Sequence, residues 1–118
     1  MLGPQAYLAA RFLDLTAAAQ RLTAENVANV DTPGYRTRGF DFQAEFRQAL
    51  DDPIHAPASP PSAREIGGLP VKNDGNDVDI ERELRALSEN TIRFSHALLM
   101  LRGGIRSVRS AIQEGRGG

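Results

Sequence analysis

The sequence predicts a mainly helical protein whose long N- and C-terminal helices pair as a coiled-coil-like hairpin. The strongest observation is a pair of apolar repeats with steps of four and three residues, one near each end of the chain. A Thr-Pro-Gly-Tyr corner and a proline-rich stretch lie between the repeats and predict that the chain turns back there. The 118 residues include no Trp, five Phe and two Tyr, few large side chains for a compact core. We therefore expect a single domain, residues 1–118, that depends on helix packing.

The N-terminal helix is predicted over about residues 5–29. Its first apolar stripe follows a heptad-like rhythm and lines one helix face. A second set keeps this rhythm on another face, and its small residues would let neighbouring helices approach closely. A surface helix needs only one apolar stripe, so two stripes predict a helix surrounded by partners. The first stripe is Leu8, Phe12, Leu15, Ala19 and Leu22, and the second is Ala6, Ala10, Leu13, Ala17, Ala24 and Val27.

The C-terminal helix, predicted over about residues 80–113, carries the clearest repeat. Asp79 is its predicted N-cap, and Glu81 and Glu83 complement the positive helix end. At 1.5 Å per residue the segment from Ile80 to Ile112 is about 50 Å long, too long for a compact globule of this size. Burial of its apolar side chains and its backbone hydrogen bonds together only roughly balance the entropy lost on folding, so the repeat needs a partner. This C-terminal seam comprises Ile80, Leu84, Leu87, Thr91, Phe94, Leu98, Leu101, Ile105, Val108 and Ile112, and together with the first N-terminal stripe it is our predicted assembly seam.

Between the helices, residues 30–79 are predicted to hold a turn, two short elements and a loop. Pro33 and Gly34 occupy the second and third positions of the corner, as in a type II turn, and Pro33 prevents the first helix from continuing. Residues 35–40 are predicted to be extended. Five of the seven prolines lie in residues 53–70, which predicts a flexible loop. A short helix would carry Phe42, Phe46, Ala49 and Leu50 on its apolar face.

Two pairs of residues interrupt the helical patterns. Asn26 and Asn29 continue the first stripe with polar groups. An amide there can fix helix register or satisfy free carbonyls, or it can simply mark a frayed helix end. Gly103 and Gly104 cost the second helix about 2 kcal/mol relative to alanine, so we expect a bend or fraying at that point.

The sequence lacks the common motifs of catalytic, nucleotide-binding and metal-binding sites. It has no Cys, HExxH, P-loop or GxGxxG, so disulfides and thiolate metal sites are excluded and enzymatic chemistry has little support. His96 is predicted to be exposed on a helix, where the adjacent Ser95 points elsewhere, and His55 lies in the loop. The acidic run NDGNDVDIE places Gly75 wrongly for a calcium-binding EF-hand, so a turn with a helix cap is the better interpretation. We predict no catalytic residue, no metal site and no cofactor.

Charge and hydropathy narrow the choice of partners. The net charge of -1 argues against a nucleic-acid binder, although the last third holds seven arginines and four acids. Arg102, Arg106 and Arg109 share one helix face, which we interpret as solvated or intersubunit.

No apolar run approaches the roughly 20 residues that span a bilayer. Arg11 and Asp14 interrupt the N-terminal apolar stretch, so we expect no secretory signal peptide.

Two stretches of the sequence resemble the axial proteins of the bacterial flagellum. NVANVDTPGYRTRGFDF, residues 26–42, resembles the N-terminal signature of rod, hook and related axial proteins. DGNDVDIERELRALSENTIRFSHALLMLRGGIRSVRSAI, residues 74–112, resembles the C-terminal half of basal-body rod proteins, and the short chain looks most like a proximal rod subunit. The first motif carries over onto Asn26, Ala28, Asn29, Thr32, Pro33, Gly34 and Tyr35, and the second motif onto Asp74, Gly75, Asn76, Val78 and Asp79.

The resemblance implies a non-enzymatic subunit of the periplasmic rod that transmits torque. It further implies export by the flagellar type III apparatus without a cleaved signal peptide. Other rod proteins, copies of the same chain and the adaptor that joins the rod to the membrane ring would be its partners. From periodicity alone, a helical adaptor or coiled-coil interaction module unrelated to flagella explains the repeats equally well. Only the two motifs separate these hypotheses.

Overall fold

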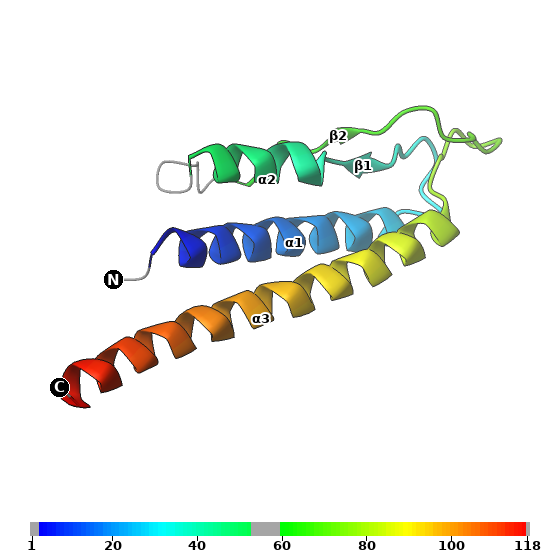
Figure 1. The fold of residues 1–118 in the computed structure, drawn as a ribbon. Coiled ribbons are helices and arrows are strands. Elements are labelled where there is room, and N and C mark those ends of the chain that lie inside the picture. Colours follow the sequence, from blue (N-terminus) through cyan, green and yellow to red (C-terminus); the bar gives the residue numbers. More distant parts are fainter. Residues whose placement is uncertain (1–2, 53–59, 118) are drawn as a thin grey trace.

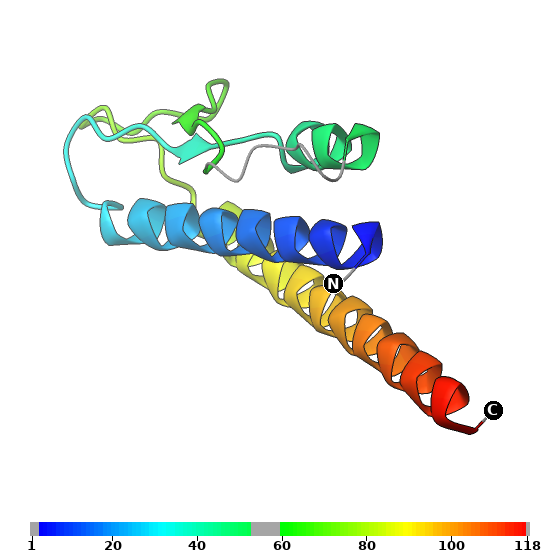
Figure 2. The same cartoon turned by 90° about the vertical axis from the view of Figure 1, so that its left-hand side faces the viewer.

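The computed structural model describes residues 3–52 and 60–117, which form an elongated helical molecule of 72 × 25 × 16 Å. Helices α1 and α3 run antiparallel, and α2 lies with the two short strands along another side of α1 (Figures 1 and 2). The predicted mainly helical hairpin is confirmed. His55 and the first part of the predicted flexible loop, residues 53–59, lie outside the described residues. The elements are α1 (Pro4–Ala28), β1 (Arg38–Gly39), α2 (Phe42–Asp51), β2 (Arg64–Glu65) and α3 (Ile80–Gly117).

Helix α1 is ended by a cap rather than by the proline corner. Pro4 suits the first helical position, where its missing N–H is not needed. The helix ends at Ala28, five residues before Pro33, so the prediction that Pro33 stops it is wrong. At the C-cap, Asn29 donates its side-chain amide to the Glu25 carbonyl at 2.8 Å and its backbone N–H to the same oxygen at 3.1 Å. These bonds satisfy a carbonyl that the last turn would otherwise leave free.

Helix α2 packs on α1 through aromatic rings. Phe12 of α1 meets Phe42 and Phe46 edge to face, with ring centroids 5.1 Å apart in both pairs. Ala49 of the predicted apolar face is buried, but Leu50 is exposed. The short helix therefore exists as predicted, and its contact with α1 rests on phenylalanines rather than on Leu50.

The two strands form a small antiparallel ribbon beside α1. β1 falls within the segment predicted to be extended. β2 falls within residues 53–70, so part of the predicted flexible loop is hydrogen-bonded to β1 in the structure. The register pairs Arg38 with Glu65 and Gly39 with Arg64.

Helix α3 is continuous from its start to Gly117 and does not fray at Gly103 and Gly104. Two glycines cost about 2 kcal/mol, which helical hydrogen bonds on both sides offset. The 38 residues of α3 span about 57 Å and the 25 residues of α1 about 38 Å. Because α3 begins level with the end of α1, its last turns extend beyond the start of α1 (Figure 1).

The interior of the molecule is small and contains many polar groups. Among the described residues, five apolar side chains are buried, against nine that are polar or charged. On α3 the buried positions Glu83, Asn90 and Ala97 are seven residues apart and face α1. Because buried polar groups must be hydrogen-bonded, the fold depends on how these side chains are paired.

Candidate functional site

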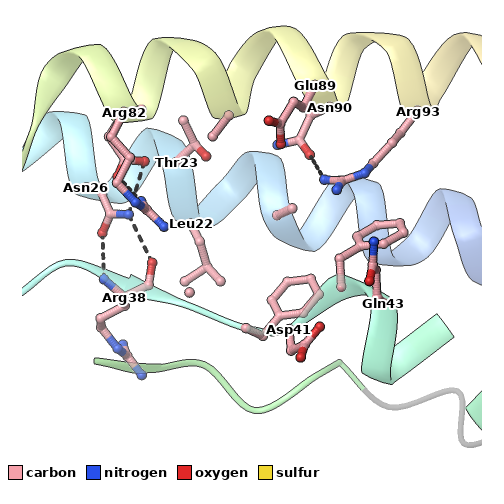
Figure 3. Close-up of a pocket in the computed structure, with 16 residues that line it drawn as sticks. Leu22, Thr23, Asn26, Arg38, Asp41, Gln43, Arg82, Glu89, Asn90 and Arg93 are labelled. Atoms are coloured by element: carbon pink, nitrogen blue, oxygen red, sulfur yellow. Dashed lines mark hydrogen bonds and ion pairs between the residues drawn. The ribbon is translucent and has the colours of Figure 1, made fainter. Parts of the chain in front are cut away.

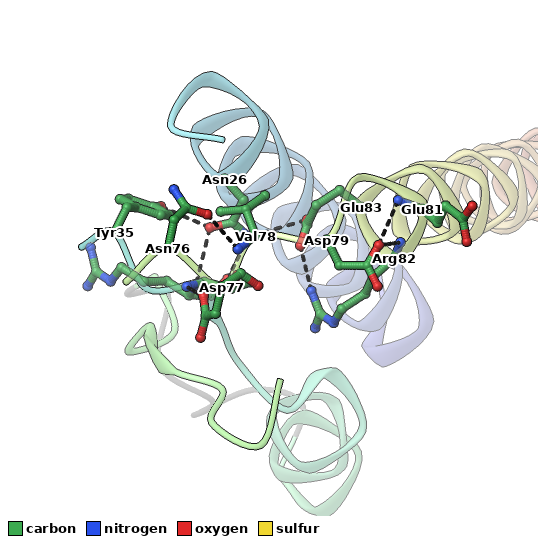
Figure 4. Close-up of polar contacts among 11 residues, drawn as sticks. Asn26, Tyr35, Asn76, Asp77, Val78, Asp79, Glu81, Arg82 and Glu83 are labelled. Carbon is green, nitrogen blue, oxygen red and sulfur yellow. Dashed lines mark hydrogen bonds and ion pairs between the residues drawn. The ribbon is translucent and has the colours of Figure 1, made fainter. Parts of the chain in front are cut away.

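The two sequence motifs meet at one end of the hairpin, where α1 ends and α3 begins (Figure 4). We call this cluster the polar junction. Several of its hydrogen bonds link residues that are 40 to 57 positions apart in the sequence. It contains the side chains of Asn26, Tyr35, Thr37, Asn76, Asp77, Arg82 and Glu83.

Asn26 is the centre of the polar junction and is 1% exposed. Its amide nitrogen donates to the Arg38 carbonyl at 3.0 Å and to Glu83 Oε2 at 3.2 Å. Its oxygen accepts from the Tyr35 hydroxyl at 2.9 Å and from the Arg38 N–H at 3.1 Å. All four hydrogen-bonding positions of the carboxamide are therefore used. Figure 3 shows Asn26 between β1 and α3, so one side chain joins three segments.

Asn76 holds the turn of the first motif against the second motif. Its amide nitrogen donates to the carbonyls of Asn29 and Thr32, both at 2.8 Å, and its oxygen accepts from the Val78 N–H at 2.8 Å. Gly34 N–H donates to the Asp74 carbonyl at 2.9 Å. The two motifs are thus one structural unit, joined by side chain and backbone.

Two glycines allow the turns of this unit to approach each other. Gly34 has φ 76° and the Tyr35 N–H donates to the Thr32 carbonyl at 3.2 Å, which confirms the predicted corner with positive φ at its third position. Gly75 has φ 85°, and a Cβ there would lie 3.4 Å from the Gly34 Cα. A larger residue at either position is strained by the backbone conformation.

Asp77 fixes the chain that follows the first turn. Its Oδ1 accepts from the Thr37 N–H at 2.6 Å and from the Thr37 hydroxyl at 2.8 Å, and Arg36 lies 3.8 Å from its Oδ2. Charged and neutral donors together compensate for burying this carboxylate. Asp77 and Thr37 were not predicted as site residues, although they lie within the two motif stretches, residues 74–112 and 26–42.

Glu83 has a different role from the one predicted. It is 1% exposed, with Oε1 accepting from Arg82 Nη1 at 2.6 Å and Oε2 accepting from Asn26. The sequence predicted that Glu83 and Glu81 both complement the helix dipole, but only Glu81 is exposed. The cap itself is as predicted, since Asp79 Oδ1 accepts from the Glu81 N–H at 3.0 Å.

The polar junction also affects the ionisation of Tyr35. Burial raises the pKa of its hydroxyl above the usual value of 10.0, the carboxylates of Glu25, Glu83 and Asp77 add to the rise, and Arg38 opposes it. The hydroxyl therefore stays protonated and donates to Asn26 through the neutral range.

Most of the motif residues selected from the sequence come together at this junction. Ala28 and Pro33 are exceptions, because both are exposed and neither side chain joins the hydrogen-bond network of the described residues. His96 is exposed as predicted. Asn26 and Asn29 have separate roles, one in the junction and one in the cap. The members that the structure brings together are Asn26, Asn29, Thr32, Gly34, Tyr35, Asp74, Gly75, Asn76, Val78 and Asp79.

The predicted seam is divided between covered and bare positions. On α1, Leu15 is fully buried, and Leu8, Phe12 and Leu22 are half-buried. On α3, the stripe that faces α1 is small or polar, so most of the C-terminal seam lies beside this stripe and is open to solvent. Leu98 and Leu101 are half-buried and Thr91 is exposed, while the side chain of Val108 lies outside the described ones. The exposed fractions of the remaining seam members are Ile80 38%, Leu84 55%, Leu87 38%, Phe94 47%, Ile105 50% and Ile112 53%.

An apolar groove of about 490 Å³ runs between α1 and α3 on the side of this seam. Leu13 and Ala17 on its α1 wall belong to the second predicted stripe, and Thr91 and Phe94 on its α3 wall belong to the seam. The two apolar faces for which the sequence predicted partners therefore adjoin one another. Ala10 and Ala17 on the α1 face and Thr91 and Phe94 on the α3 face are exposed.

A polar cleft of about 330 Å³ opens between α1, α3 and the start of α2 (Figure 3). Its arginines have partners within the chain. Arg82 is hydrogen-bonded to Glu83, while Arg93 donates to Asn90 at 3.1 Å and lies 4.1 Å from the centre of the Phe42 ring. Acidic and basic side chains both line the cleft, so it favours neither anions nor cations.

The part of the chain that the structure describes has neither a membrane-spanning helix nor a cluster of metal ligands. None of its helices is both long and apolar enough to cross a bilayer. No three His, Cys, Asp or Glu side chains in that part are grouped to hold a metal ion.

The sequence of the chain is similar to those of flagellar rod proteins. A sequence profile described as "Flagella basal body rod protein" matches residues 7–36. The chain is 31% identical over 122 residues to the flagellar basal body rod protein FlgB of Escherichia coli (strain K12), with 87% of this chain and 88% of the relative covered. It is 33% identical over 111 residues to FlgB of Borrelia hermsii, covering 75% and 80%, and 30% identical to FlgB of Salmonella typhimurium, covering 87% and 88%.

Proposed function

The chain belongs to the FlgB family of flagellar basal-body rod proteins, and we propose that it assembles through apolar surfaces that are bare in the isolated chain. It is a structural subunit of the bacterial flagellar basal-body rod. The assembly surface we propose combines the exposed C-terminal seam of α3 with the small-residue face of α1. The polar junction holds the two helices so that these surfaces stay side by side.

One observation carries this proposal. Helix α3 turns small and polar side chains such as Ala97 and Asn90 toward α1, while Leu84 and Phe94 are about half exposed. A hydrophobic stripe left open along a long helix marks an interaction surface. Neighbouring subunits that cover this stripe would supply the packing energy that the small interior of a single chain lacks.

The role we propose is mechanical rather than catalytic. Its partners would be other rod proteins, copies of this chain and the adaptor between rod and membrane ring. Family membership supports a place in the periplasmic rod and export by the flagellar type III apparatus without a cleaved signal peptide. The two proposed helix surfaces would then be covered only after export, during assembly.

A matched pair of substitutions tests the surface. Leu87 and Ser88 are adjacent and exposed on α3, but only Leu87 belongs to the seam. Leu87→Asp should abolish incorporation into purified hook-basal bodies and motility, because it buries an unpaired charge between subunits. Ser88→Asp adds the same charge off the seam and should be incorporated normally. Mass spectrometry of washed hook-basal bodies measures incorporation, and Leu87→Asp at the wild-type level would contradict the proposed surface. Leu98→Asp should behave as Leu87→Asp does.

A further inference from the structure

The last turns of α3 carry a surface that the rest of the chain leaves open. We call residues 102–113 the α3 tail. Helix α3 is about 20 Å longer than α1 and begins level with the end of α1, so its tail extends beyond the hairpin (Figure 2). Ile105 and Ile112 are 50% and 53% exposed.

Arginines flank this apolar stripe. Arg102, Arg106 and Arg109 follow one another in steps of four and three, so they form a row along one side of the helix. Ile105 is three residues from Arg102 and four from Arg109, which makes them neighbours on the helix surface. All three arginines are exposed, and within the described part of the chain none has a hydrogen-bond or ion-pair partner. No acidic residue lies between positions 99 and 113.

We propose that the α3 tail docks against a helix of a neighbouring rod subunit whose exposed apolar stripe is flanked by carboxylates. The inference rests on the proposed function, because it extends the same assembly surface to its end. Ile105 and Ile112 are the last members of the C-terminal seam, so one partner surface can cover them together with the earlier members. Opposite charges beside the apolar contact would fix which partner docks and in which register.

The start of α3 shows that this fold can present such a partner surface. Ile80 and Leu84 are exposed there, and Asp79 and Glu81 are exposed beside them. Residues 79–92 at the beginning of the seam hold four acidic residues against two arginines, so this end is net acidic, whereas the tail is basic. A subunit built in this way would offer its acidic end to the basic tail of a neighbour, in a head-to-tail contact that can propagate along a rod.

Photo-crosslinking in motile cells identifies what the tail touches. In cells that make no wild-type copy of this chain, benzoylphenylalanine would replace Ile112. In the control it would replace Ser110, which lies on the opposite side of the helix. After irradiation, hook-basal bodies are purified and the crosslinked peptides are sequenced by mass spectrometry. We expect Ile112 to crosslink several-fold more than Ser110, to a helical peptide that carries Asp or Glu beside its apolar residues. A crosslink from the tail to residues 79–92 of a second copy of this chain would also support the proposal. Products with lipid, with a surface lacking carboxylates, or no product would overturn the proposal.

Charge reversal gives a second test. Arg106→Glu with Arg109→Glu should lower incorporation into hook-basal bodies about tenfold or more, because carboxylates would then face carboxylates. The control pair Arg47→Glu with Arg64→Glu reverses two exposed arginines on α2 and β2, away from the tail and from the seam, and should be incorporated normally. Circular dichroism of the purified variants checks that both pairs keep their helices.

The outcomes separate this inference from the proposed function. If the reversed tail is incorporated as well as its control while Leu87→Asp is still excluded, the tail proposal is wrong and the seam proposal stands. If Leu87→Asp is also incorporated normally, both are wrong. Arg106→Lys with Arg109→Lys keeps the charge and should preserve incorporation, whereas loss of incorporation in this variant would show that the tail does not act through charge.

Discussion

The polar junction and the C-terminal seam lie on the same helix, α3, but their side chains are partnered in different ways. At the junction, Glu83 and Asn26 are 1% exposed and hydrogen-bonded within the chain. Along the seam, Leu84, Phe94 and Ile112 are about half exposed. One end of the hairpin is therefore complete in a single subunit, and the long seam is incomplete without others. Substitutions at the junction should change the stability of the isolated chain, and substitutions on the seam should change assembly.

The largest effect on stability is expected from Asn26→Leu. It removes four hydrogen bonds, so the buried Glu83 Oε2 and the part-buried backbone groups of Arg38 lose the partner that Asn26 provides. We expect the free energy of unfolding to fall by about 3 to 5 kcal/mol. Asn29→Leu removes only bonds at the helix end and should cost about 1 kcal/mol. Urea unfolding followed by circular dichroism measures both, and equal losses would mean that Asn26 is not the centre of the junction.

Glu83→Gln and Glu81→Gln separate the buried carboxylate from the exposed one. The amide at position 83 cannot accept from both Arg82 and Asn26, so we expect a loss of about 1 to 3 kcal/mol. Glu81 contributes only through the helix dipole, and its replacement should cost less than about 1 kcal/mol. The same unfolding experiment applies, and a larger loss at Glu81 would reverse the roles assigned to the two residues.

Two glycine substitutions should have opposite signs. Gly75→Ala forces a side chain onto a residue with φ 85° beside Gly34 and should cost about 1 to 2 kcal/mol. Gly103→Ala lies inside α3 with open space around its Cβ and should stabilise the chain by about 0.5 to 1 kcal/mol. Thermal unfolding of both variants checks the sign, and stabilisation by Gly75→Ala would show that the turn is not held as described.

A pH-dependent effect on stability is expected at Tyr35. The raised pKa of its hydroxyl means that the folded state holds this proton more tightly than the unfolded state. The resulting stability is fully present below about pH 10 and is lost as the pH rises through the higher folded pKa. Tyr35→Phe removes this dependence and costs about 1 kcal/mol at neutral pH through the lost bond to Asn26. Unfolding at pH 7 and above pH 10 should show the two proteins converging, and parallel curves would contradict the assignment.

The helices could be predicted because apolar spacing is a local property of the sequence. The seam members on α3, the cap at Asp79 and the turn at Gly34 all follow from residues within a few positions of one another. The face of α3 that packs on α1 could not be found in this way. Glu83, Asn90 and Ala97 are small or polar, and hydrophobic periodicity does not detect them.

The polar junction could not be predicted from the sequence for a related reason. Asn26 and Glu83 are 57 positions apart, and only the antiparallel pairing of α1 and α3 brings them together. A glutamate in the first helical turn suits the helix dipole whether or not it is buried, so Glu83 had the same sequence context as Glu81. Resemblance to rod proteins located both motifs, but the fold was needed to show that they form one network.

Cysteine labelling tests the central claim most directly, that the seam is bare in the isolated chain and covered in the rod. The chain has no Cys, and Thr91 is an exposed seam member lining the groove. A Thr91→Cys chain would be treated with a maleimide as purified protein, in intact hook-basal bodies, and after those bodies are dissociated. We predict rapid labelling of the purified chain, protection in the intact rod and recovery of labelling on dissociation. Equal labelling in the intact rod and in the free chain would contradict the account.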